Sequence, residues 1–112
     1  MDNKSFRDKI YILTNKIPKG KVATYGQLAE LAGSPGAARA VGMCMKHNPN
    51  APYTPCHRVV ASDGKLTGYS ADGGLRKKKQ MLMAEGVKFI GDKVNLRVSK
   101  WKSESQQHDH GL

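Results

Sequence analysis

A cysteine and a histidine stand next to each other, at Cys56 and His57, directly after Pro55. The thiolate is a strong nucleophile, and histidine is a common partner that activates a thiol. Pro55 fixes the preceding backbone and removes one hydrogen-bond donor. The pair indicates nucleophilic cysteine chemistry. The competing interpretation is that Cys56 is a small core residue and His57 an accidental neighbour.

Neighbouring residues of a regular strand point to opposite faces, so Cys56 and His57 would not touch on such a strand. Linking the thiol to the imidazole then requires a bridging water or an irregular backbone. A zinc site built from these two residues with Cys44 and His47 is disfavoured, because the spacing matches no recognised ligand pattern. Cys44 lies in a predicted helix and is expected to pack in the core.

The overall charge points to a polyanionic partner. The 112 residues include 19 Lys and Arg against 9 Asp and Glu, a formal net charge of +10 at pH 7. Nucleic acid is the first candidate, because each phosphate that Lys or Arg neutralises releases counterions, and an anionic membrane surface is the second. No apolar run is long enough to span a membrane, and the N-terminus lacks the apolar middle of a signal peptide. We therefore expect a cytoplasmic protein with reduced cysteines.

The length predicts a single domain, which we place at residues 1–102, followed by a disordered polar tail at 103–112. An amphipathic helix is predicted from apolar residues at helical spacing, namely Phe6, Ile10, Leu13 and Ile17. Thr24 and Gln27 have the spacing of a capping box, which predicts a helix over 25–32 that Gly33 ends.

The Ser-Pro pair after Gly33 predicts the N-cap and first turn of a further helix over 35–47. Two short helices joined by a tight turn form a helix-turn-helix. A short strand is predicted at Val59–Val60, a helix at 75–85, and a closing hairpin from 87–89 and 94–98. These elements predict an α/β fold of about four to five helices around a short mixed or antiparallel sheet.

The predicted helix over 35–47 is poorly equipped to read bases in a major groove. Arg39 is the only long side chain in its first two turns, among small residues at Ala37, Ala38, Ala40 and Gly42. Small residues allow close approach to a minor groove, and a lone arginine can be inserted into the base stack. The alternative is that the small residues pack against a neighbouring helix while Arg39 is solvated.

Several segments together resemble one family. Residues 55–60 (PCHRVV) resemble the active-site signature of the methylated-DNA–protein-cysteine methyltransferases, also called O6-alkylguanine-DNA alkyltransferases. Other blocks resemble the family in the same order and at nearly the same spacing: 24–29, 37–42, 48–49, 68–70 and 85–86. The resemblance covers about residues 6–98 and only the family's C-terminal catalytic domain. The N-terminal domain of longer members, with any zinc site there, is expected to be absent.

This resemblance implies direct DNA repair, in which Cys56 accepts an alkyl group from O6 of guanine once per molecule, with no metal or other cofactor. It implies that His57 acts on Cys56 through a water, that Glu85 orients the imidazole, and that Asn48 braces the turn. Tyr69 would donate to the departing base and Ser70 would hydrogen-bond its O6. The carbonyl of Val59 and the side chain of Met45 would complete the base pocket.

The resemblance also implies that the partner is double-stranded DNA containing O6-alkylguanine, bound by a monomer from the minor groove. The lesion must be rotated out of the duplex before a thiolate can reach it. Tyr25 would turn the 3′ phosphate and Arg39 would fill the vacated stack. Ala38 and Gly42 would allow close approach to the minor groove, and Thr24 and Ser62 would contact the DNA backbone.

Three alternatives stay open. Short alkyltransferase-like proteins bind the same lesion without reacting and recruit other repair factors. They carry a tryptophan in place of the nucleophile, where this sequence has Cys56 and its one tryptophan is Trp101. A plain helix-turn-helix transcription factor would need side chains that read bases. A Cys-His hydrolase would leave the large positive charge unexplained and would need an oxyanion site that the sequence does not indicate.

Overall fold

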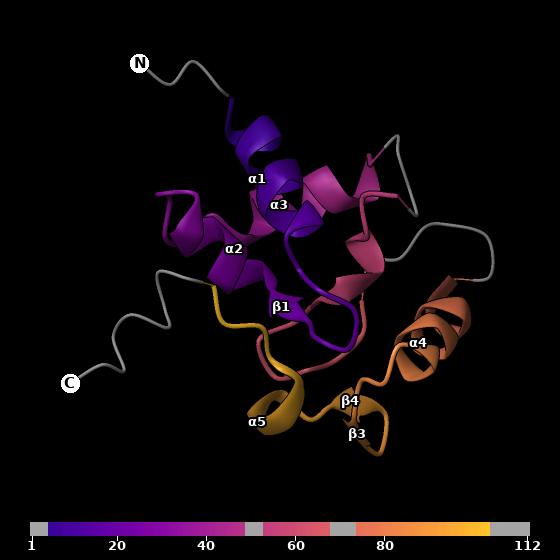
Figure 1. The fold of residues 1–112 in the computed structure, drawn as a ribbon. Helices are drawn as coiled ribbons and strands as arrows, with labels where there is room; N and C mark the ends of the chain where they lie inside the picture. The colour runs from indigo at the N-terminus through magenta and orange to yellow at the C-terminus, as the bar shows by residue number, and fades with distance from the viewer. Residues whose placement is uncertain (1–4, 49–52, 68–73, 104–112) are drawn as a thin grey trace.

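The computed structural model describes residues 5–48, 53–67 and 74–103. Short helices dominate it, and two pairs of very short strands connect them (Figure 1). In chain order the elements are α1 (Phe6–Asn15), β1 (Ala23–Thr24), α2 (Tyr25–Leu31), α3 (Ala38–Lys46), the 3-10 helix η1 (Cys56–Arg58), β2 (Val59–Val60), α4 (Gly74–Ala84), β3 (Phe89–Ile90), β4 (Lys93–Val94) and α5 (Leu96–Ser99). The predicted α/β class is confirmed.

The strands form two separate pairs rather than one sheet. β1 and β2 are parallel, with Ala23 opposite Val59 and Thr24 opposite Val60, whereas β3 and β4 are antiparallel. Residues that alternate along a strand serve opposite faces. Accordingly, Ala23 and Val59 belong to the core cluster shared with α1, α2 and α3, and Val22 and Val60 belong to a second cluster with α4 and the hairpin.

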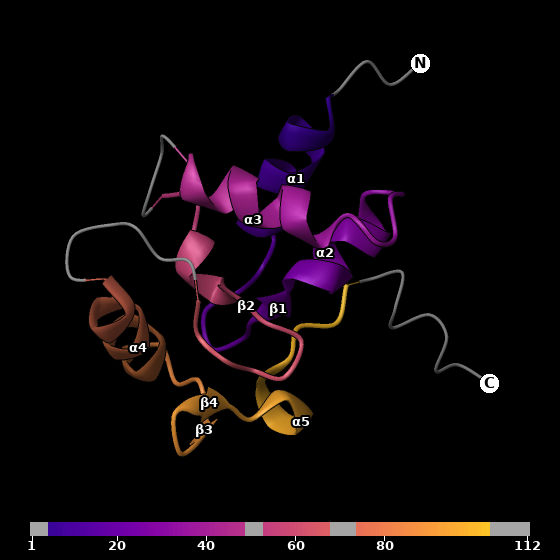
Figure 2. The ribbon, with the colours of Figure 1, turned by 180° about the vertical axis from the view of Figure 1, so that it is seen from behind.

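Figure 2 shows the arrangement that results from these two faces of the β1–β2 pair. The three N-terminal helices lie on one side of β1 and β2, and α4, the hairpin and α5 lie on the other. The turn that carries Cys56 lies just before β2, and its cysteine packs in the first cluster. The cysteine turn thus lies where the two halves of the molecule meet.

The start of α2 agrees with the predicted capping box. The hydroxyl of Thr24 accepts from the backbone N–H of Gln27 at 3.0 Å, and the Gln27 side chain accepts from the Thr24 N–H at 3.2 Å. Gly33 follows with φ +86°, a left-handed conformation that ends the helix at no steric cost to glycine. The capping box and Gly33 therefore fix the two ends of α2, the first helix of the two-helix unit formed with α3.

The predicted start of the third helix is wrong. α3 begins at Ala38, and the segment before it is a turn in which the Ala37 N–H donates to the Ser34 carbonyl at 3.0 Å. Gly36 has φ +92°, which a right-handed helix cannot contain. Ser34 is therefore not an N-cap, and the following proline is not in the first turn of a helix.

The predicted closing hairpin is correct only in its central part. β3 and β4 pair across the turn at Gly91, but the second predicted strand, 94–98, gives way to α5. Asn95 causes the change, because its side chain accepts from the N–H of Arg97 and starts a helical turn. A local cap thus outweighs the alternating pattern that predicted a strand.

The segment after α5 returns to β1. The N–H of Val22 donates to Ser99 O at 2.8 Å, and the N–H of Trp101 donates to Val22 O at 2.7 Å. Gln27 Nε2 also donates to the Trp101 carbonyl, at 2.7 Å. Ser103 is still buried, and the rest of the predicted tail, 104–112, lies outside the described residues. Within the described ranges, no helix is long and apolar enough to cross a bilayer.

The turn after β2 depends on Gly64. Its φ is +91°, its N–H donates to Ala61 O, and its carbonyl accepts from the Val94 N–H at 2.9 Å. A Cβ at this position would overlap the Val94 carbonyl oxygen. The turn and the hairpin can therefore approach each other only because residue 64 lacks a side chain.

Gly64→Ala is expected to lower the free energy of unfolding by about 3 kcal/mol, combining left-handed strain with the overlap at Val94. Gly33→Ala is the matched control, because Gly33 also has positive φ but an added Cβ meets nothing within 4 Å. The control should lose only about 1 kcal/mol in urea denaturation. Equal losses in the two variants would contradict the close approach.

Candidate active site

Cys56 begins a 3-10 turn, not the regular strand considered from the sequence. Its N–H donates to Thr54 O at 2.8 Å, and the N–H of Arg58 donates to Pro55 O at 2.9 Å. Asn48 Nδ2 donates to the same Thr54 carbonyl at 2.9 Å, so the side chain predicted to brace the turn contacts its backbone. Cys56 is 7% exposed. The tight turn removes the opposite-face geometry that a strand would impose on Cys56 and His57.

The carboxylate of Glu85 reaches two residues of η1. His57 Nε2 lies 3.0 Å from Glu85 Oε2, and Arg58 donates from Nε to Oε1 at 2.9 Å and from Nη2 to Oε2 at 2.8 Å. Arg58 Nη1 also donates to Ile17 O at 2.7 Å. This two-pronged arginine–carboxylate geometry is strong and directional, so it fixes the end of α4 against η1.

The contact with Glu85 determines which nitrogen of His57 is free to take a proton. An ionised carboxylate only accepts, so Nε2 of the imidazole donates its hydrogen to Glu85. In a neutral ring Nδ1 is then the acceptor. Nδ1 is buried and has no hydrogen-bond partner among the described residues. The arrangement is a histidine held in one tautomer, whose basic nitrogen has no partner in the described part of the chain.

The charges around His57 favour its neutral form. Burial lowers the pKa of His57, the charges of Arg58 and Lys78 lower it further, and the net shift is downward although Glu85 acts to raise it. Burial acts to raise the pKa of Glu85, but the hydrogen bonds from Arg58 and His57 outweigh burial, and the net pKa lies below its ordinary value. At neutral pH the pair is therefore a carboxylate with a neutral imidazole.

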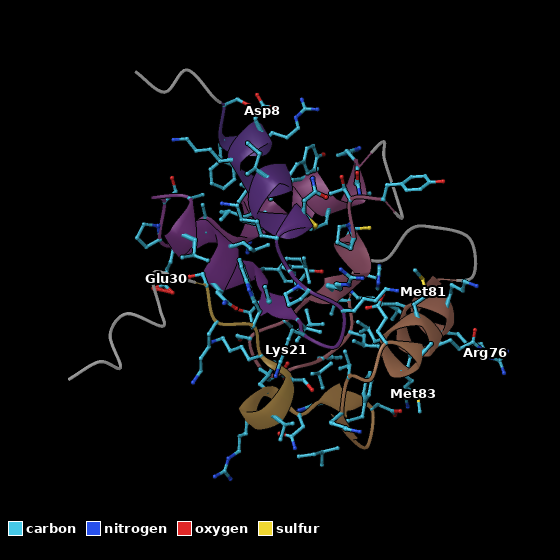
Figure 3. All side chains as sticks on the ribbon, viewed as in Figure 1. Asp8, Lys21, Glu30, Arg76, Met81 and Met83 are labelled. Carbon is cyan, nitrogen blue, oxygen red and sulfur yellow. The ribbon has the colours of Figure 1, made fainter. Side chains whose placement is uncertain are left out.

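Helix α4 presents one face to η1. Lys78, Leu82 and Glu85 follow a helical spacing of four and three, which places them along one stripe. Lys78 and Leu82 are buried, while Arg76 and Met83 point away from the molecule (Figure 3). The stripe thus carries a cation near one end and a carboxylate near the other.

The sequence interpretation missed Lys78. Its Nζ donates to Val59 O at 2.7 Å and to Thr67 O at 2.8 Å, and the side chain is 1% exposed. The signal was available in the helical period, because Lys78 is the one lysine of the Arg-Lys-Lys-Lys run that lies on the same stripe as Leu82 and Glu85. The neighbouring cationic residues made this signal hard to recognise, because runs of charged residues usually lie in solvent.

A groove lies beside α3, the helix that Figure 2 shows next to α2. It has a volume of about 370 Å³ and is lined by Tyr25, Ala38, Arg39, Gly42, Lys46 and Thr67. Four residues predicted from the sequence to contact DNA, Tyr25 of α2 and Ala38, Arg39 and Gly42 of α3, are therefore brought together here. The Tyr25 hydroxyl donates to Thr67 O at 3.1 Å and is oriented along the groove wall.

Gly42 has no structural explanation within the described part of the fold. A Cβ added at Gly42 would meet nothing within 4 Å, and its φ is not positive. Glycine inside a helix costs about 0.5–1 kcal/mol relative to alanine. No contact among the described residues therefore requires glycine at position 42.

The other predicted residues have different positions. Met45 packs in the core cluster that contains Cys56, and the Val59 carbonyl already accepts from Lys78. Ser62 is exposed, whereas Thr24 is buried and its hydroxyl serves the capping box, which leaves it only a small exposed surface for any contact with DNA. Tyr69 and Ser70 lie outside the described residues.

The two cysteines are both free, as expected for reduced thiols. Cys44 is half-buried on α3 and packs against the edge of the first core cluster, rather than inside it as predicted. Over 5–48, 53–67 and 74–103, no three His, Cys, Asp or Glu side chains gather in a group that could hold a metal ion. The chemistry of the described site is that of a thiol, an imidazole and a carboxylate.

Comparison with known proteins gives consistent results. The family model for the 6-O-methylguanine DNA methyltransferase DNA binding domain matches residues 5–87. A methylated-DNA–protein-cysteine methyltransferase of Mycolicibacterium paratuberculosis is 48% identical over 80 residues, which are 71% of this chain and 47% of the relative. A DNA base-flipping protein of Vibrio parahaemolyticus is 42% identical over 99 residues, which are 87% of this chain and 96% of that protein.

Two solved structures are similar over much of the fold. S. pombe Atl1 in complex with damaged DNA containing O6-carboxymethylguanine has a TM-score of 0.76 and 35% identity, covering 92% of this chain and 100% of that one. Mycobacterium tuberculosis OGT in complex with DNA has a TM-score of 0.69 and 42% identity, covering 76% of this chain and 52% of that one.

The chain spans about half the length of the curated methyltransferases that it matches. The family match nevertheless covers most of the chain and includes η1, the groove residues and Glu85. This chain belongs to the family defined by the DNA-binding domain of 6-O-methylguanine DNA methyltransferase.

Proposed function

We propose that this protein repairs DNA by moving an alkyl group from O6 of guanine to Cys56, once per molecule. The observation that most supports this proposal is the position of the Cys56 thiol. Cys56 adjoins a neutral His57 that Glu85 holds in one tautomer, and its turn packs between α4 and the helices that line the groove. Methyltransferases with this chemistry in their names are similar to the chain over most of its length.

The proposed reaction begins with loss of the Cys56 proton. A free cysteine titrates near pH 8.5, so a base is needed at neutral pH. His57 Nδ1, which has no partner within 5–48, 53–67 and 74–103, accepts the proton through a bridging water, and the carboxylate of Glu85 stabilises the resulting imidazolium. The proton passes from Cys56, which becomes a thiolate, to His57, which becomes an imidazolium, and Glu85 remains ionised throughout.

In the transfer step the thiolate attacks the alkyl carbon. The S–C bond forms as the C–O6 bond breaks, and the electron pair leaves with guanine, which then takes a proton. The product on Cys56 is a neutral thioether with no good leaving group. Because such a thioether does not return to the thiol by itself, we expect the reaction to stop after one turnover.

DNA binding is assigned to the groove beside α3. Arg39 is exposed on its rim, and the small residues Ala38 and Gly42 leave room for a duplex backbone to approach the helix. A base inside a duplex cannot reach a buried thiol, so the nucleotide must rotate out. Tyr25 lines the groove and also packs against the core cluster of Cys56, which links the binding surface to the reacting atom.

A second candidate function is binding of the lesion without reaction. Two proteins favour it, because the Vibrio base-flipping protein and the Atl1 structure match this chain over nearly their whole length. Cys56, His57 and Glu85 favour transfer instead. A protein that only binds the lesion has no use for a thiol next to a histidine oriented to act as a general base. The two candidates share DNA binding and differ only in chemistry at Cys56.

Incubation with a duplex containing O6-methylguanine is expected to raise the mass of the protein by one methylene. Trypsin separates the two cysteines onto peptides 40–46 and 47–58, so mass spectrometry locates the gain on the Cys56 peptide. Cys56→Ser should bind the duplex without gaining mass, and Cys44→Ser should react like the wild type. Tight binding of the lesion with an unchanged mass would establish the second candidate.

Gly42→Ala is expected to raise the free energy of unfolding by about 0.5–1 kcal/mol and, at the same time, to weaken binding to the lesion duplex. The opposite signs arise because the methyl group meets open space in the folded chain but would meet DNA in the groove. Gly26→Ala is the matched control, since Gly26 is also helical and unobstructed but does not line the groove. If Gly42→Ala binds as tightly as wild type in fluorescence anisotropy, the groove is not the DNA surface.

Glu85→Gln is expected to slow transfer at neutral pH by about 10- to 100-fold without changing affinity for the duplex, because a neutral amide stabilises the imidazolium poorly. Single-turnover kinetics at several DNA concentrations separate the two quantities. Glu30→Gln, which changes an exposed glutamate on α2, should leave both unchanged. Loss of affinity instead of rate would argue against the relay.

The same variant tests the pKa shift of Glu85. A carboxyl whose pKa is lower in the folded state stabilises the fold above its unfolded pKa, and this contribution disappears as the pH falls through the folded pKa. Wild-type protein should therefore lose stability in acid more steeply than Glu85→Gln. Parallel acid profiles in thermal denaturation would contradict the ionised Glu85.

A further inference from the structure

We propose that this protein has a second surface for DNA phosphates, separate from the groove beside α3 and independent of the lesion. The surface is a hollow between the loop after α1 and the segment from α5 to residue 102, which we call the basic pocket. It has a volume of about 410 Å³. Its lining combines four cations with two ring residues, namely Lys21, Arg97, Lys100, Lys102, Pro18 and Trp101.

The groove beside α3 leaves most of the positive charge of the chain without a role. The formal net charge is +10, yet Arg39 and Lys46 are the cations that line the groove. The basic pocket has four cations against these two, and no acidic side chain is among its lining residues. Affinity for a nucleic-acid backbone rises with the number of phosphates that Lys and Arg neutralise. Of these two surfaces, the basic pocket is therefore the more strongly electrostatic.

The end of the described chain presents its lysines to the pocket by strand-like alternation. Every second residue is buried, at Ser99, Trp101 and Ser103. Lys100 and Lys102 are exposed between them, on the opposite side from the Trp101 ring, which packs in the first core cluster. Lys100 is extended and bridges to Val22, so the segment has a fixed backbone. Both lysines follow residue 87, where the family match ends, so that match does not account for them.

Three cations of the basic pocket are not neutralised by carboxylates. Within residues 5–48, 53–67 and 74–103, Lys21, Arg97 and Lys100 form no ion pair. Lys21 Nζ donates instead to the Val98 carbonyl at 2.9 Å, which orients its ammonium group beside α5. Like charges that the backbone holds close together repel one another, and an anion placed among them removes this repulsion.

The basic pocket and the groove lie on different sides of the molecule. They share no lining residue. In Figure 1, α1 and the loop after it lie in front of α3, and Figure 3 shows Lys21 of this loop beside α5 in the same view. From behind, in Figure 2, α3 is in front. A phosphate bound at Lys21 therefore belongs to a part of the DNA outside the groove.

A nucleic-acid backbone fits the basic pocket better than a bilayer does. Membrane-surface sites combine cations with large exposed apolar side chains that insert among the lipids. In the basic pocket Trp101 is 9% exposed and packs in the core, which leaves Val98 and Pro18 as the exposed apolar lining. A hollow rich in cations matches a convex row of phosphates.

The test compares charge removal in the basic pocket with equal charge removal elsewhere. Arg97→Gln/Lys100→Gln removes two exposed cations of the pocket. Arg76→Gln/Lys77→Gln is the matched control, because it removes one Arg and one Lys that are exposed on α4 and line neither surface. Fluorescence anisotropy gives the affinity for an undamaged duplex, and for the same duplex with one O6-methylguanine, over a range of salt concentrations.

We expect the pocket variant to bind both duplexes about tenfold more weakly at low salt, with a log–log salt slope about 1.8 less steep, because each lost phosphate contact removes about 0.9. The ratio of the two affinities should keep its wild-type value, since the pocket does not contact the lesion. The control variant should keep the wild-type slope. Equal slopes in the two double variants would overturn the inference.

Trp101 reports on binding at the basic pocket itself. It is the single tryptophan of the chain and lines the pocket, so its indole N–H gives one resonance in 15N-labelled protein. Titration with the undamaged duplex should shift this resonance in the wild type and in the control variant, but not in the pocket variant. An unshifted resonance in the wild type would contradict DNA binding at this surface.

Vesicles of phosphatidylcholine and phosphatidylserine supply the other polyanion. We expect them to sediment the wild type and the pocket variant to the same extent. If they sediment only the wild type, while both proteins bind DNA alike, the surface serves a membrane and the inference fails.

The undamaged duplex keeps this inference separate from the proposed function. Failure of the wild type to gain a methylene from O6-methylguanine DNA would refute the transfer reaction and leave the difference in salt slope intact. Normal transfer combined with equal slopes in the two double variants would do the reverse.

Discussion

The carboxylate of Glu85 is the contact on which the arrangement of the site depends. It accepts two hydrogen bonds from Arg58 and one from His57, and Arg58 donates a further hydrogen bond to the Ile17 carbonyl. One side chain at the end of α4 therefore fixes the cysteine turn, the imidazole tautomer and the segment after α1. Two of these partners come from η1 and are adjacent in sequence, so a small displacement of α4 would move both. Because the group is only partly exposed, water competes weakly for these bonds.

The groove beside α3 and the segment after the cysteine turn share a second contact, the carbonyl of Thr67. It accepts from the Tyr25 hydroxyl, which lines the groove, and from Lys78 Nζ, which reaches Val59 beside the cysteine turn. A carbonyl has two lone pairs, so both donors can be satisfied at once. The Thr67 carbonyl thus joins Tyr25 to Lys78 by two hydrogen bonds. Together with Glu85, this contact connects the cysteine turn and the groove beside α3 through hydrogen bonds of α4 and the residue after it.

The sequence was most informative where local rules operate. The capping box at Thr24 and the helix after it are as predicted, since both depend only on residues three apart. The third helix began late because Gly36 has a left-handed conformation that its type permits but does not require. The roles of Arg58 and Lys78 depend on which distant segments meet α4, and no local pattern specifies that. Cys56 and His57 were recognised by their types and by family resemblance, whereas the irregular turn that orients them was left open.

The strand-like return of residues 99–101 to β1 has a consequence for where this folding unit ends. The family match stops at residue 87, yet Val22 exchanges its backbone hydrogen bonds with Ser99 and Trp101, and Gln27 donates to the Trp101 carbonyl. A chain cut at the boundary of the sequence family would leave these buried polar groups of β1 and α2 without partners. The segment by which the family is recognised and the segment that is stable as a folded unit therefore end at different residues. For this protein the folded unit extends at least as far as residue 101.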